Sequence, residues 1–134
     1  MILVVGARTS GKRSFVMQEY GYQPEQIADA ILDERPVICN LQDYLKANPD
    51  SSADPDSSAK LLGLLVKKEV VICNEIGSGI VPLQASEREW REATGRLCIA
   101  LAEQAKQVVR IVCGLPTVLK DSETTAKAPR EEES

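Results

Sequence analysis

The chain has 134 residues, of which 43% are hydrophobic, 27% are charged and only 4% are aromatic. This composition predicts one folded domain with an aliphatic core and excludes a disordered chain. The net charge of −4 is concentrated in residues 121–134, which carry −3, so the rest of the chain lacks the basic charge of a nucleic-acid-binding protein. No apolar stretch approaches the roughly 20 residues of a membrane-spanning helix, and no basic leader precedes the first apolar run. We therefore predict a cytoplasmic protein that binds neither nucleic acid nor membrane.

Metal sites built on cysteine or histidine are not indicated. The chain has no histidine, and its four cysteines, Cys39, Cys73, Cys98 and Cys113, form no CxxC pair, so the spacing of a zinc site is absent from the sequence. Three of the four end aliphatic runs, and we expect them to be small, buried, reduced side chains.

Short apolar runs alternate with helical patterns along the chain. The runs predict strands buried on both faces at residues 1–5, 36–39, 69–73 and 108–113. Between them we predict helices from residue 11 or 12 to 20, over 25–33, over 41–48 and 57–68 on either side of a flexible loop at 49–56, and over 86–106. The last helix has a capping box of Ser86 and Glu89 at its start. This alternation predicts an α/β fold with a mainly parallel sheet.

The polar, acidic composition after residue 120 contrasts with the body of the chain. It contains no apolar residue larger than alanine, so we predict a disordered acidic tail at 121–134 after a single domain at 1–120.

The stretch "GARTSGKRS" follows the first predicted strand. Gly-x4-Gly-Lys between a strand and a helix is the pattern of a phosphate-binding loop, in which backbone N–H groups, the helix dipole and a lysine hold an anion. The sequence therefore predicts a P-loop NTPase-like three-layer sandwich. The candidate nucleotide-binding residues are Gly6, Ala7, Arg8, Thr9, Ser10, Gly11, Lys12, Arg13 and Ser14, with Asn74 from a later strand end.

Arg13 departs from the usual pattern of such loops. The residue after the lysine normally offers a hydroxyl to Mg²⁺, whereas a guanidinium has no lone pair to offer. Ser14 is one position late, which on a helix turns its side chain by about 100°. Two interpretations stay open: Arg13 binds a phosphate oxygen directly and weakens the dependence on metal, or it points to solvent.

Polar residues follow the predicted strands where α/β proteins bind ligands. Asn40, Asn74 and Glu75 lie at the carboxyl ends of their strands. Glu75 is the candidate to hold Mg²⁺ or to accept a substrate proton, and with Lys12 it is our candidate catalytic residue. The alternative for Glu75 is a solvated carboxylate in a turn.

The stretch "VVICNEIGSGIVPLQASEREWREATGRL", together with "MILVVGARTSGK" and "VVRIVCGLPTVLK", resembles the adenosylcobinamide kinase / adenosylcobinamide-phosphate guanylyltransferase family of cobalamin biosynthesis. In that family a strand leads into an asparagine, a glutamate and a glycine loop ending in Ile-Val-Pro, as at Asn74, Glu75 and residues 77–82. The resemblance covers residues 1–14 and about 36–120. It implies a nucleotide-dependent kinase that uses GTP or ATP and Mg²⁺, acts on a cobinamide and assembles into a homo-oligomer.

Three features depart from the family pattern. Residues 21–35 replace the segment with the histidine that carries the guanylyl group, so we expect no guanylylation by that route. Cys39 stands in the place of an aspartate that serves the metal, with Asp43 a helical turn away, and Arg13 replaces the loop hydroxyl.

Two functions therefore stay open. The resemblance favours a kinase that phosphorylates a cobinamide hydroxyl with GTP or ATP. The lost hydroxyl, acidic ligand and histidine favour reduced or no activity, and hence a nucleotide- or corrinoid-binding partner or regulator.

Overall fold

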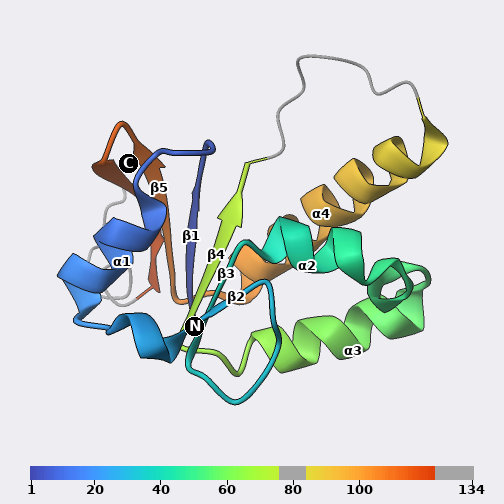
Figure 1. The fold of residues 1–134 in the computed structure, drawn as a ribbon, viewed down its shortest axis with the longest axis horizontal. Helices are drawn as coiled ribbons and strands as arrows, with labels where there is room; N and C mark the ends of the chain where they lie inside the picture. Colours follow the sequence, from blue (N-terminus) through green and yellow to red (C-terminus); the bar gives the residue numbers. More distant parts are fainter. Residues whose placement is uncertain (76–83, 123–134) are drawn as a thin grey trace.

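The fold is an α/β sandwich around one six-stranded sheet (Figure 1). The computed structural model describes residues 1–75 and 84–122. In the sheet order β2-β3-β4-β1-β5-β6, all neighbouring strands pair in parallel except β5 and β6, which pair antiparallel. The predicted mainly parallel sheet is confirmed. The strands are β1 (Ile2–Gly6), β2 (Ile27–Asp29), β3 (Val37–Cys39), β4 (Val70–Asn74), β5 (Gln107–Val112) and β6 (Leu115–Asp121).

Helices cover both faces of the sheet, which confirms the three layers. Helix α1 (Lys12–Tyr20) lies on one face, and α2 (Leu41–Ala47), α3 (Pro55–Leu65) and α4 (Ala85–Gln104) lie on the other (Figure 1). None of the helices in residues 1–75 and 84–122 is long and apolar enough to cross a membrane.

The strands read as continuous apolar runs because each of their faces meets a helical layer. In β1, Leu3 packs into the core under α2, α3 and α4, whereas its neighbour Val4 packs with Val16 of α1. The same alternation places Val71 and Ile72 of β4 in the two opposite cores. Period-two alternation of buried side chains thus builds two cores from one sheet.

The helix predicted over 25–33 is wrong. The segment forms a 3-10 turn (Pro24–Gln26) and the edge strand β2, whose Ile27 and Ala28 are buried and pair with Val37 and Ile38 of β3. Pairing with an existing sheet edge satisfies the backbone and buries these side chains, and this outweighs the weak helical pattern of the segment.

Two further local predictions need correction. Gln84, and not Ser86, is the N-cap of α4, and no side chain caps that end; Ser86 lies inside the first turn, so the predicted capping box is wrong. The loop at 49–56 contains a 3-10 turn (Pro49–Ser52), and α3 already begins at Pro55 after its N-cap Asp54, whose carboxylate accepts from the Ser57 N–H.

The β5–β6 hairpin was not predicted. Cys113 and Gly114 form its turn with positive φ angles of 51° and 77°, and Cys113 is exposed, so its predicted burial is wrong, whereas Cys39 and Cys73 are buried and Cys98 is half-buried. The predicted tail begins too early, because Asp121 still belongs to β6 and the Ser122 N–H donates to Lys106 O. Residues 123–134 lie outside the described residues.

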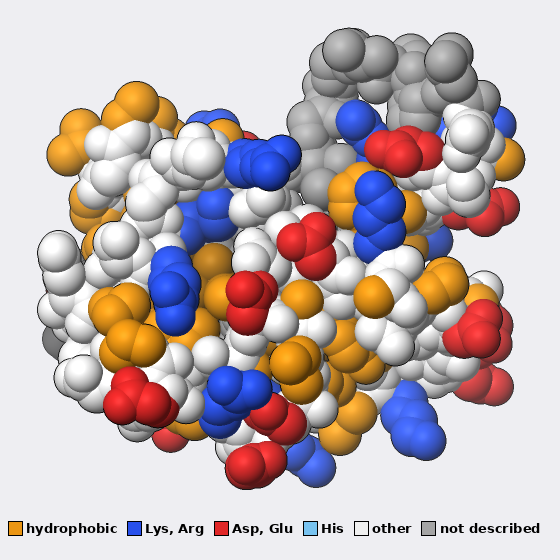
Figure 2. Space-filling view, viewed as in Figure 1, with side chains coloured by type: hydrophobic (Ala, Val, Ile, Leu, Met, Phe, Trp, Pro, Cys, Tyr) orange, Lys and Arg blue, Asp and Glu red, His pale blue; other side chains and the backbone are white. Residues whose placement is uncertain are grey.

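The β5–β6 hairpin carries a group of exposed apolar side chains. Side chains at its tip and along β6 gather at the upper left of the space-filling view (Figure 2). Their exposed fractions run from 49% to 70% for Val112, Val118, Leu119 and Leu115.

Candidate functional site

The predicted phosphate loop connects β1 to α1 and depends on its two glycines. A Cβ on Gly6 would lie 2.6 Å from both Ile111 O and Ser10 Oγ, so only glycine fits there. Gly11 is the N-cap of α1 with a φ of 93°, where glycine is favoured. Close packing therefore explains the first glycine of the motif, Gly6, and a left-handed backbone explains the second, Gly11.

Lys12 lies inside this loop. Its side chain is buried, and Nζ donates to Ala7 O at 2.7 Å and to Ser10 Oγ at 3.4 Å. Burial lowers the pKa of Lys12, an effect that Cys73 and Glu75 partly oppose. An ammonium has three N–H donors, so one further donor beyond these two bonds can serve an anion.

Neighbouring strands hold the loop at both ends. The Glu75 N–H donates to Gly6 O at 2.8 Å, and the Gly114 N–H donates to Ser10 O at 2.8 Å. The end of β4 and the β5–β6 turn therefore fix the position of the loop.

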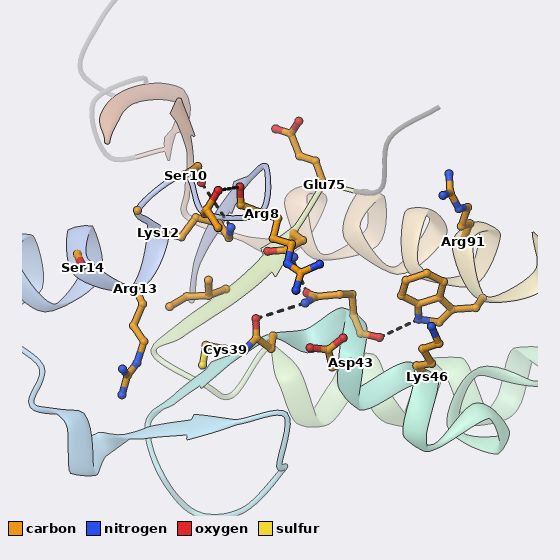
Figure 3. Close-up of a pocket in the computed structure, with 17 residues that line it drawn as sticks. Arg8, Ser10, Lys12, Arg13, Ser14, Cys39, Asp43, Lys46, Glu75 and Arg91 are labelled. Carbon is orange, nitrogen blue, oxygen red and sulfur yellow. Dashed lines mark hydrogen bonds between the residues drawn. The ribbon is translucent and has the colours of Figure 1, made fainter. Parts of the chain in front are cut away.

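The loop lines a cavity of about 650 Å³, a size typical of small-molecule sites (Figure 3). Two acidic residues, Asp43 and Glu75, line it together with five cationic residues, so the lining is net positive and suits an anionic ligand. The five cations are Arg8, Lys12, Arg13, Lys46 and Arg91.

Nine of the predicted site residues line this cavity, which brings the loop and the end of β4 together. They are Arg8, Thr9, Ser10, Gly11, Lys12, Arg13, Ser14, Asn74 and Glu75. Gly6 and Ala7 are not among the lining residues; Gly6 ends β1, and Ala7 contributes the carbonyl that accepts from Lys12. The glycine loop predicted at 77–82 lies outside the described residues.

Gln42 organises the cavity wall and was missed by the sequence analysis. Its side chain is buried; Oε1 accepts from the Asn74 N–H at 2.9 Å, and Nε2 donates to Asn40 Oδ1 at 3.3 Å. It thereby joins the ends of β3 and β4 to the first turn of α2. The sequence offered one signal for the role of Gln42: it is a polar residue between the apolar residues Leu41 and Leu45 at the start of a predicted helix.

Trp90 closes the far side of the cavity from α4. Its Nε1 donates to Gln42 O at 2.7 Å, and Lys46 Nζ lies 4.9 Å from its ring centroid. The sequence pattern indicated Trp90 only as an apolar position of the last helix, and Lys46 and Arg91 were not predicted.

Glu75 is engaged by Arg110 of β5. Arg110 Nε donates to Glu75 Oε2 at 2.5 Å and Nη2 donates to Oε1 at 3.1 Å, a bidentate pair that raises the pKa of Arg110. In Figure 3 the Glu75 side chain points away from Cys39 and Asp43. Both oxygens of the Glu75 carboxylate therefore accept hydrogen bonds from a cationic side chain of the same chain.

Cys39 lies at the end of β3 in the cavity wall. Burial, followed by the nearby Asp29 carboxylate, raises the pKa of its thiol to about 11, so the group is neutral at pH 7. Asp29 ends β2 opposite Cys39 in the sheet, and its Oδ1 accepts from Asn40 Nδ2 at 2.7 Å.

The three positions expected to serve Mg²⁺ do not offer its usual ligands, which are hydroxyl, carboxylate, carbonyl and water oxygens. Arg13 replaces the loop hydroxyl, Cys39 contributes a neutral thiol, and Glu75 is paired with Arg110.

Comparisons with known proteins identify the family of this chain. A sequence model of the cobinamide kinase / cobinamide phosphate guanyltransferase family matches residues 36–119, which is more than half of the chain, so the chain belongs to this family. The match includes β3, β4 and α4 and begins after the phosphate loop.

A curated relative supports the same family. The bifunctional adenosylcobalamin biosynthesis protein CobP of Pseudomonas aeruginosa is 39% identical over 82 residues, which make up 60% of this chain and 47% of the relative. The chain thus spans about half the length of this relative.

Proposed function

We propose that this member of the cobinamide kinase family binds GTP or ATP at the loop of residues 6–14 and phosphorylates a hydroxyl of a cobinamide. The observation that carries the proposal is Lys12, buried at the start of α1 beside a net-positive cavity of about 650 Å³. The family match and the similarity to an adenosylcobalamin biosynthesis protein support the substrate class.

In the proposed reaction the loop holds the phosphates and the ends of the strands meet the acceptor. Lys12 and the N–H groups at the start of α1 stabilise the negative charge on the transferred phosphoryl group. The acceptor oxygen forms a bond to the γ-phosphorus while the bond from phosphorus to the bridging oxygen breaks, and the nucleoside diphosphate leaves.

Glu75 is our candidate to take the proton of the acceptor hydroxyl. It follows β4 directly, and its N–H donates to Gly6 O, which places its backbone beside the start of the loop. Its carboxylate must exchange Arg110 for the acceptor hydroxyl to act as a base. Asn74, whose N–H is held by Gln42, positions this strand end.

The proposed activity stops at phosphorylation. Guanylylation in this family uses a histidine, and the chain has none. The family-typical segment is replaced by residues 21–35, part of which forms β2.

A second candidate function is a catalytically degenerate member that binds a nucleotide or corrinoid and acts through a partner. The Glu75–Arg110 pair favours it, because both carboxylate oxygens already accept hydrogen bonds from Arg110 and do not face an acceptor hydroxyl.

Transfer of the γ-phosphoryl group from labelled GTP or ATP to cobinamide tests both candidates. We compare the chain with Lys12→Ala and with Lys60→Ala, a control at an exposed position of α3. Transfer by the chain and by Lys60→Ala, lost in Lys12→Ala, supports the kinase. Binding of the nucleotide or of cobinamide without transfer supports the degenerate partner, and a chain that binds neither compound and shows no transfer refutes both candidates.

The cytoplasmic location, the homo-oligomer and the disorder of the acidic tail stay predictions.

A further inference from the structure

The charges around the phosphate loop are arranged unlike those of a metal-dependent P-loop. In such a site the loop hydroxyl and a carboxylate hold Mg²⁺, which neutralises the phosphate oxygens. Here the position after Lys12 is a permanent cation, and the residue at the end of β3 is the uncharged thiol of Cys39.

Arg13 lies on the Cys39 side of the cavity. Figure 3 shows its side chain leaving α1 away from Lys12. Its positive charge acts on the Cys39 thiol, where it opposes part of the rise in pKa that burial causes. The guanidinium therefore brings positive charge to the wall where β3 ends in the thiol of Cys39 instead of a carboxylate.

Arg8 brings a second guanidinium from the other side. In Figure 3 it extends from the loop toward Asp43 of α2, between the loop and the strand ends. Arg8, Lys12 and Arg13 are all among the residues that line the cavity. Guanidinium groups bind phosphate oxygens through paired N–H donors, and this binding does not need a metal ion.

The Glu75 carboxylate does not cancel this charge. Both oxygens of Glu75 accept hydrogen bonds from Arg110, a residue outside the cavity lining. Arg110 therefore neutralises Glu75, and Asp43 is the other carboxylate of the lining that faces the three loop cations.

We propose that this chain binds the triphosphate of its nucleotide without a divalent cation, because Arg8 and Arg13 supply, beside Lys12, the positive charge that Mg²⁺ supplies in other P-loop sites. The proposal rests on the proposed function, since it presupposes a nucleotide at the loop.

Calorimetric titration with GTP and with ATP, in excess Mg²⁺ and in EDTA, tests the proposal. The chain is compared with Arg13→Thr, which restores a hydroxyl after the lysine, and with Arg88→Thr, a control on an exposed position of α4 outside the cavity. Thermal unfolding of each variant checks that the fold is kept.

We expect the affinity of the chain and of Arg88→Thr to change by less than about threefold between Mg²⁺ and EDTA. Arg13→Thr should bind at least about tenfold more weakly in EDTA and regain affinity when Mg²⁺ is added.

Binding by the chain that requires Mg²⁺ would overturn this inference and leave the proposed function standing. If Arg13→Thr and the unchanged chain bind the nucleotide equally well in EDTA, Arg13 does not contribute to binding, and this result would also overturn the inference. Absence of binding in both conditions would refute the proposed function itself.

Discussion

Replacing Gln42 by methionine should separate the ends of β3 and β4 from α2. Methionine has nearly the length and volume of glutamine, so the change removes two hydrogen bonds and creates little cavity. The Asn74 N–H would lose its acceptor at 2.9 Å, and Asn40 Oδ1 would lose its donor at 3.3 Å.

The expected loss follows from these contacts. A fully buried N–H without an acceptor costs about 1–3 kcal/mol; Asn74 is half-buried and the longer bond to the half-buried Asn40 adds little, so we expect a loss of about 1 kcal/mol in the free energy of unfolding. With a urea m-value of about 2 kcal/mol/M, the midpoint should fall by about 0.5 M.

Urea unfolding followed by the emission of Trp90, the single tryptophan, measures this loss next to the substituted residue. Gln18→Met on the exposed surface of α1 is the matched control and should unfold like the unchanged chain. A loss below about 0.5 kcal/mol for Gln42→Met would refute the reasoning, because the Asn74 N–H would then have found another partner.

Three further outcomes are expected. Gly6→Ala should abolish nucleotide binding and lower the thermal midpoint, since the added Cβ lies 2.6 Å from Ile111 O; a variant with unchanged binding would contradict the required close packing. Among the cysteines, only Cys113 is exposed, so a thiol reagent should modify one group rapidly in the folded chain and none rapidly in Cys113→Ser, as measured by mass. Because burial places the pKa of Lys12 below its ordinary value of 10.5, nucleotide affinity should fall as the pH rises through that lowered pKa; an affinity that stays constant up to pH 10.5 would exclude Lys12 as a phosphate ligand.

The phosphate loop could be predicted from the sequence because its constraints are local. Gly6 and Gly11 are needed within a nine-residue stretch, and Lys12 follows from the same pattern. The central strands were equally visible, since a strand buried on both faces reads as a continuous apolar run.

The state of Glu75 could not be predicted, because it depends on the strand order. Glu75 follows β4 and Arg110 lies on β5, with β1 between these strands in the sheet. β1 ends there at Gly6, which pairs with Asn74 on one side and Ile111 on the other. The carboxylate and the guanidinium meet across the end of a strand that has no side chain at this position.

The edge strands and the second wall of the cavity were missed for similar reasons. β2 has only three residues, and its pairing with β3, not its own pattern, makes it a strand. Trp90 and Gln42 are 48 residues apart, so their contact across the cavity wall has no local signal.

The most direct test of nucleotide binding at the loop is a titration of the chain with GTP and ATP, followed by the fluorescence of Trp90. Trp90 and Lys12 line the same cavity, so a nucleotide held by Lys12 should change the emission to saturation, and Lys12→Ala should abolish the change. A saturable change that is identical in Lys12→Ala would place the nucleotide elsewhere and contradict the assignment of residues 6–14 as the phosphate site.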